Sequence, residues 1–298
     1  MKQAIVIAAI TLLVLAGGGA AAYFLIWQPA EGEVTATVAT ENKPKPKAEE
    51  RKTKRDDKSN RAADAKFNDL MRDGNEKLLE EPAKADQKFQ EALKEAQTAD
   101  QKVKAWYGRA MAAKVMENGE LEYQAGQTIL TIAQTTRDKA NAYEAIAHGR
   151  YLRQSYGEAV SDYQQAADDY IKSGDASMAC TMLVEAARIL RYNMQDYSGA
   201  ERILAKAGEA VDKGSVEEIR EKVIKWMLCL ERADNCKLAG DGAGQVFWNR
   251  AAVQYNPAWK ETADWVERQV EVQGTPVETS PPVGSGETLS AATDSEDK

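Results

Sequence analysis

Three stretches of this chain repeat one spacing of small and large residues, and this repetition limits the folds that are open to it. The stretches are PAKADQKFQEAL (82–93), SYGEAVSDYQQA (155–166) and DYSGAERILAKA (196–207). Each places an alanine four residues before a large side chain and another alanine three residues after it, as in Ala159, Tyr163 and Ala166. Positions spaced by three and four share one face of an α-helix. The pattern predicts helices that approach closely at the alanines, with the large side chain filling the space beside them.

The segment from 61 to 273 is predicted to be helical throughout. Only Pro82 and Pro257 occur between residues 47 and 275, and helix-favouring Ala, Glu, Lys and Gln dominate. Turn-forming residues interrupt the helical period at short intervals, for example at Asn118-Gly119 and Lys213-Gly214. The breaks predict helix pairs near 61–99, 101–135, 138–172, 175–212 and 215–255, with a last helix near 258–272.

Two side chains are predicted to cap these helices at their N-terminal ends. Asp175 and Ser215 each stand just before an apolar helical period. Ser215 is followed three residues later by Glu218, which is the spacing of a capping box.

The third pair resembles the tetratricopeptide repeat (TPR), a helix–turn–helix unit of about 34 residues. Tyr143, Ile146 and Ala147 match the aromatic, leucine and small positions of that family's first helix, and the 155–166 stretch matches its second helix. The fourth pair keeps the second-helix pattern, whereas the second pair keeps only Tyr107-Gly108 in its first helix. The resemblance implies an all-α, TPR-like α-solenoid of about five helix pairs plus a capping helix.

The same resemblance implies a protein-binding groove, because first helices line the concave surface in that family. Carried over by register, the expected groove residues are Lys102, Arg109, Glu144, His148, Tyr151, Glu185 and Tyr192. The alternative for the two tyrosines is an ordinary place in the core. The Lys and Asn pattern with which some family members grip chaperone C-termini does not recur here.

The N-terminal segment from Ala4 to Trp27 contains 24 residues without a charge. Such a helix would be about 36 Å long, which is enough to cross a bilayer with some tilt. Lys2 precedes it and the next lysine is Lys43, so the positive-inside rule predicts a cytoplasmic N-terminus and an extracytoplasmic repeat domain. The alternative is a signal peptide cleaved near GGGAAA, which would give a secreted or periplasmic protein.

The segments on either side of the repeats have compositions that oppose folding. Residues 28–60 form a charged, Pro-containing linker, and residues 274–298 form an acidic tail rich in Pro, Gly, Ser and Thr. Both are expected to be disordered.

Charge and reactive residues argue against several classes of function. The net charge is −8, and residues 61–273 carry 29 Lys and Arg against 35 Asp and Glu, so nucleic acid is not an expected partner. His148 is the only histidine, and Cys180, Cys229 and Cys236 are too few and too widely spaced for a disulfide framework or a zinc site. No catalytic, metal or cofactor site is expected.

The expected function is therefore binding. The first hypothesis is a membrane-tethered adaptor or scaffold in an envelope-associated complex for secretion, translocation or cell-wall work. The rival is a structural subunit that forms homo-oligomers or belongs permanently to a large membrane complex.

Overall fold

The computed structural model describes residues 47–272 of this chain, with side chains from residue 62 onward. The chain divides into two compact units, Met1–Lys52 and Thr53–Lys298, and the second is the subject below. The expected anchor at 4–27 and the expected tail at 274–298 lie outside the described residues. Among the helices that are described, none has the length and apolarity needed to cross a bilayer.

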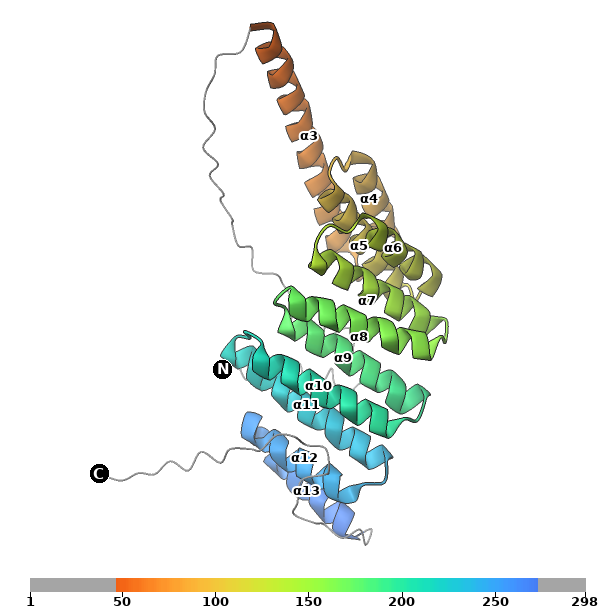
Figure 1. Ribbon diagram of the computed structural model, residues 1–298, viewed down its shortest axis with the longest axis vertical. Coiled ribbons are helices and arrows are strands. Elements are labelled where there is room, and N and C mark those ends of the chain that lie inside the picture. Colours follow the sequence, from red (N-terminus) through yellow and green to blue (C-terminus); the bar gives the residue numbers. More distant parts are fainter. Residues whose placement is uncertain (1–46, 273–298) are drawn as a thin grey trace, which may run out of the picture. The chain divides into compact units, whose positions relative to one another are not determined.

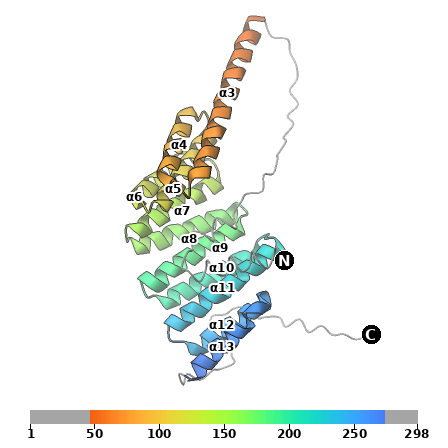
Figure 2. The ribbon, with the colours of Figure 1, turned by 180° about the vertical axis from the view of Figure 1, so that it is seen from behind.

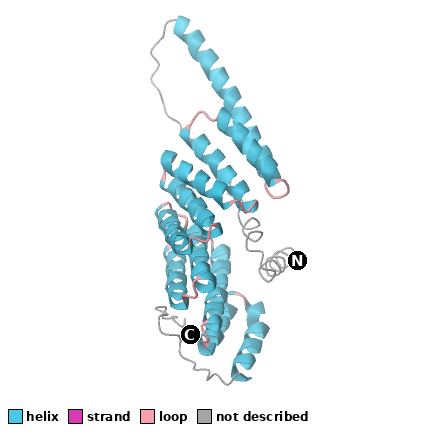
Figure 3. Ribbon diagram, turned by 90° about the vertical axis from the view of Figure 1, so that its right-hand side faces the viewer, coloured by secondary structure: helices cyan, strands magenta, loops and turns pink. Residues whose placement is uncertain are grey.

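Every described element is a helix, which confirms the predicted all-α class (Figure 3). The boundaries agree with the predicted pairs to within a few residues from α4 onward. The elements are α3 (Lys47–Lys77), α4 (Pro82–Glu95), α5 (Ala99–Val115), α6 (Gly119–Ile132), α7 (Thr136–Leu152), α8 (Tyr156–Lys172), α9 (Ala176–Arg188), the π-helical turn η1 (Ile189–Asn193), α10 (Tyr197–Lys213), α11 (Glu218–Leu238), α12 (Gly242–Tyr255), the 3₁₀ turn η2 (Pro257–Trp259) and α13 (Lys260–Val272).

From α4 to α13, each helix packs mainly on the helices that precede and follow it in the chain (Figures 1 and 2). Helix α5 also contacts α7, and α9 also contacts α11. Both of these contacts between alternate helices join odd-numbered helices. The arrangement is solenoid-like, as expected for units that cannot bury their apolar faces alone.

The repeated spacing is a packing device, as predicted. Ala159, Tyr163 and Ala166 are all buried, and so are their counterparts in the other two stretches. Phe89 is the clearest case, because its ring is fully buried against Gly108 of α5. A Cβ atom added at Gly108 would lie 2.6 Å from the Phe89 ring, so the glycine makes room for the phenyl group.

Glycine also sets the close approach of α6 and α7. A Cβ atom added at Gly149 would lie 2.7 Å from the carbonyl oxygen of Gly119 and 2.8 Å from the backbone nitrogen of Tyr123. These two helices therefore touch through their backbones. This contact fixes the position of α7, which carries three of the predicted groove residues.

One of the two predicted N-caps is confirmed and the other is wrong. The Asp175 carboxylate accepts a hydrogen bond from the Met178 N–H at 3.1 Å, as an N-cap does. Helix α11 instead begins at Glu218, with Glu217 at its N-cap position and no side-chain cap. Ser215 lies two residues too early for the predicted capping box, because the chain stays extended at Glu217.

The N-terminal boundary of the folded segment also differs from the prediction. Helix α3 begins at Lys47, so residues 47–60 are helical although we expected them to belong to a disordered linker. Their sequence, KAEERKTKRDDKSN, is rich in Lys, Arg, Glu and Ala, which are good helix formers even without an apolar face. The rest of the expected linker lies outside the described residues.

Candidate protein-binding surface

The predicted groove residues lie on α5, α7 and α9, the first helices of their pairs, and on the turn η1 that follows α9. Lys102 and Arg109 belong to α5; Glu144, His148 and Tyr151 to α7; Glu185 to α9; and Tyr192 to η1. The structure does not collect them into one cluster. It distributes them over three polar groups, and most of them are held by other side chains of the same chain.

At α5, Arg109 is tied to the neighbouring helix. Its Nε donates a hydrogen bond to Asp86 of α4 at 2.7 Å, and its guanidinium lies 4.7 Å from the centre of the Trp106 ring. The side chains of Arg109 and Asp86 are only 14% and 12% exposed, so this pair joins α4 to α5. Lys102 is exposed at the first turns of the same helix and remains available to a partner.

Glu144 is part of the interior, with only 2% of its surface exposed. Its Oε2 accepts hydrogen bonds from Tyr170 of α8 at 2.9 Å and from Tyr107 of α5 at 3.3 Å. Lys114 of α5 lies 3.6 Å away and supplies positive charge. Glu144 therefore joins three helices, and a partner protein cannot reach it directly.

The single histidine pairs with a second buried carboxylate. His148 Nδ1 lies 2.6 Å from Glu122 Oε2 of α6, and Glu122 is 2% exposed. Burial raises the pKa of Glu122, and the interaction with His148 offsets part of that rise. The ring centres of His148 and Tyr151 lie 5.9 Å apart, and those of Tyr151 and Tyr156 lie 6.0 Å apart. Tyr151 is half-buried, so it is neither a fully exposed groove residue nor a fully buried core residue.

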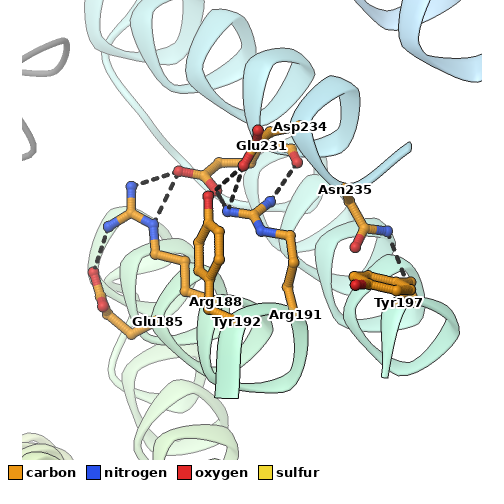
Figure 4. A network of polar contacts seen from close by, with 8 residues as sticks. All are labelled: Glu185, Arg188, Arg191, Tyr192, Tyr197, Glu231, Asp234 and Asn235. Atoms are coloured by element: carbon orange, nitrogen blue, oxygen red, sulfur yellow. Dashed lines mark hydrogen bonds and ion pairs between the residues drawn. The ribbon is translucent and has the colours of Figure 1, made fainter. Parts of the chain in front are cut away.

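A network of polar contacts joins α9 and η1 to α11 (Figure 4). Arg188 donates to Glu231 at 3.0 Å and to Glu185 at 2.9 Å. Arg191 donates to the Glu231 carboxylate at 2.6 Å and to its backbone carbonyl at 2.7 Å, and lies 3.4 Å from Asp234. Burial alone would raise the pKa of Glu231, but the two arginines outweigh it and hold that pKa below its ordinary value. Glu231 is thus the anionic centre between two cations.

This network holds Tyr192 at the surface. The residue belongs to the π-helical turn Ile189–Asn193, in which Met194 donates its N–H to the carbonyl five residues earlier. Its hydroxyl hydrogen-bonds to Asp234, and the Arg191 guanidinium lies 4.5 Å from its ring centre. Tyr192 is nevertheless 57% exposed. A large aromatic side chain is therefore presented to solvent in a fixed position.

A cleft of about 390 Å³ lies between α6, α7 and α8. Arg150 and Asp162 close part of it with a 2.6 Å ion pair, and burial raises the pKa of Asp162 despite the arginine. The residues lining it are Gln127, Leu130, Thr131, Tyr143, Ile146, Arg150 and Asp162. None of these was predicted as a site residue, because the family register pointed only to the opposite side of α7.

The thiols and acidic groups of the described residues offer no metal centre. Cys180, Cys229 and Cys236 are all buried, and none of the three forms a disulfide bond. Burial raises the pKa of the Cys180 and Cys236 thiols to about 12, far from the range in which a thiolate forms at neutral pH. Within residues 62–272, no group of three or more His, Cys, Asp or Glu side chains is arranged to hold a metal ion.

Sequence reasoning missed Arg191, Glu231 and Asp234, which hold the predicted Tyr192 in place. Glu231 and Asp234 lie three residues apart on α11, about 40 residues after their partners. The spacing of charges along α11 was the available signal, but any exposed helix face carries similar charges.

No protein-family model, no curated protein and no solved structure matches this chain. A stack of helix pairs supports many unrelated functions, so the fold alone assigns none. What distinguishes this surface is its own geometry: polar contacts and ion pairs along the first helices, and one tyrosine exposed beside α11.

Proposed function

We propose that this chain is a membrane-tethered, TPR-like adaptor that binds a protein partner along the first helices of its pairs. The observation that carries the proposal is Tyr192, which is 57% exposed yet fixed by Asp234 and Arg191. Exposed tyrosines beside arginines are enriched at the centres of protein interfaces. Because the side chain is already immobilised, binding loses little conformational entropy there.

The surroundings of Tyr192 suit a partner with both polar and apolar groups. The side chains of Glu185 and Asp234 are each 39% exposed, and Asp234 is the one that hydrogen-bonds to the Tyr192 hydroxyl. Arg188 and Arg191 hold these carboxylates in place. Together they form a small aromatic surface with fixed hydrogen-bond acceptors at its edge.

The TPR assignment is supported by the correspondence of sequence and packing. Gly108 accommodates Phe89 as the small second residue of a Tyr-Gly or Leu-Gly motif does, and the stretch 155–166 buries its alanines in α8. The tether is supported by the uncharged run from Ala4 to Trp27. This layout favours a role in an envelope-associated complex, with the repeats outside the cytoplasm.

The test is co-purification of the full-length protein from membranes solubilised in a mild detergent. We expect a reproducible partner with the wild-type chain, and loss of that partner with Tyr192→Ala. Ile171→Ala is the matched control, since Ile171 is 43% exposed on α8 and lies outside the proposed surface. Recovery of the wild-type protein alone, or equal recovery of the partner by Tyr192→Ala, would refute the proposal.

The second candidate function is a structural subunit that associates with copies of itself. The observation that favours it is Trp265 of α13, which is 56% exposed.

A further inference from the structure

The last described helix exposes a tryptophan and a valine on its outer side. Helix α13 packs on α12 and η2 through Ala263, Val266 and Val270. The preceding helices from α5 to α12 each contact a helix on both sides, whereas no described helix follows α13. Trp265 is 56% exposed and Val272 is 83% exposed on its outer side.

The outer side of α13 is a continuous face. Residues 261, 265, 268 and 272 are spaced by four, three and four, so they lie in one row along the helix. All four are exposed. The terminal helix of a solenoid normally has a polar outer face, so an exposed tryptophan on that face indicates a binding surface.

The charges on either side of Trp265 have opposite signs. Glu261 lies four residues before the tryptophan and Arg268 three residues after it; farther out, Lys260 precedes it and Glu271 follows. These four side chains are exposed, and none of them takes part in the ion pairs found among residues 62–272. They differ in this from Asp264 and Glu267 of the same helix, which pair with Arg250 of α12.

We propose that α13 docks against α13 of a second copy of this chain, antiparallel and about a two-fold axis beside Trp265, an inference that rests on the second candidate function above. A two-fold contact brings the same patch of both copies together, so the patch must complement itself. With a rise of 1.5 Å per residue, Glu261 of one copy lies within about 2 Å, along the axis, of the level of Arg268 of the other. The two tryptophans then cover each other at the centre.

The chain's own C-terminal segment is a poorer occupant for this face. It contains Pro276, Pro281, Pro282, Gly284 and Gly286, which interrupt any helix long enough to cover α13. One helix face is also smaller than the interface of a stable dimer, so the dimer should be weak and concentration-dependent. Attachment to a membrane would raise the local concentration and favour it.

The test is sedimentation velocity of the full-length chain in mild detergent, from about 1 to about 200 µM, which brackets a weak dimer. We expect a dimer that grows with concentration. Trp265→Ala should abolish it. Glu261→Arg and Arg268→Glu, each alone, should weaken it about tenfold or more, because like charges then meet at both ends of the contact. Lys237→Glu, an exposed charge reversal on α11, should leave it unchanged.

The decisive arm is an equimolar mixture of the Glu261→Arg and Arg268→Glu chains. In a mixed dimer each reversed charge meets an opposite one, so heterodimers should form about as well as wild-type dimers. Three results would overturn the proposal: a wild-type chain that stays monomeric throughout, a mixture no better than either variant alone, or a Trp265→Ala chain that still dimerises. Dimerisation only after removal of residues 273–298 would also overturn it, since the tail would then be the occupant. Circular dichroism confirms that each variant is folded.

Discussion

We expect Gly149→Ala to force α6 and α7 apart. The new methyl group would lie 2.7 Å from the carbonyl oxygen of Gly119 and 2.8 Å from the backbone nitrogen of Tyr123. Ordinary contact begins at 3.4 Å, so the two helices would have to separate by roughly 0.7 Å. Both contacts are with the backbone, which cannot rotate away as a flexible side chain can.

The magnitude is a balance of two effects. Alanine is intrinsically better than glycine in a helix interior by about 0.8–1 kcal/mol. Overpacking a close contact costs about 1–3 kcal/mol, and contacts with rigid backbone belong at the upper end. We therefore expect a net loss of about 1–2 kcal/mol in the free energy of unfolding.

Gly157 provides the matched control for this substitution. It lies in the first turn of α8, is exposed, and a Cβ atom added there would meet nothing within 4 Å. Gly157→Ala should therefore stabilise the protein by up to about 1 kcal/mol. Urea melts followed by circular dichroism measure both changes, and hydrogen exchange should localise the effect of Gly149→Ala to α6 and α7. A Gly149→Ala chain as stable as the wild type would refute the close-contact argument.

Three further substitutions test the buried polar groups and the repeated spacing. Glu231→Ala should lower the free energy of unfolding by about 3–5 kcal/mol, because it leaves Arg191, 2% exposed, without its main counter-charge. Glu122→Gln should change the pH dependence of stability: the raised pKa means that the folded chain holds this proton more tightly than the unfolded chain. The wild type should therefore lose stability relative to Glu122→Gln as pH rises above 4.5. Ala159→Leu should cost about 1–3 kcal/mol through overpacking.

Chemical melts decide all three. For Glu231, a loss no larger than that of an exposed control such as Glu209→Ala would contradict a central role in the network. For Glu122, parallel stability curves of the two proteins between pH 4 and 7 would contradict the raised pKa. For Ala159, an unchanged melting curve would mean that this alanine does not contact a neighbouring helix.

The fold was largely predictable because its information is local and repeated. The positions of Ala85, Phe89 and Ala92 follow a helical period that any single stretch reveals, and all three are fully buried. Breaks such as Asn118-Gly119 identify helix ends because glycine and asparagine favour turns. The failed cap at Ser215 shows the limit: a cap depends on where the helix actually starts, and the chain between α10 and α11 delays that start.

The candidate surface was less predictable because its partners come from distant helices. Glu144 lies on α7 and Tyr192 on the turn η1 after α9, but Glu144 is buried by tyrosines that lie 37 and 26 residues away. The π-helical turn that positions Tyr192 has no sequence signature, since it is stabilised by contacts with α11. Periodicity indicates a helix face, but it does not reveal which side chain on that face is already occupied.

The network between α9 and α11 also bears on how the solenoid unfolds. In most stacks of this kind each unit is stabilised by its immediate neighbours, so terminal helices can fray one at a time. Here Arg188 and Arg191 pair with Glu231 of α11, so α9 and η1 are coupled to a helix that lies beyond α10 in the chain. Opening of α11 would break the ion pairs of α9 at the same step. The C-terminal half should therefore melt as one cooperative block, and the tyrosine presented by η1 should keep its position until that block opens.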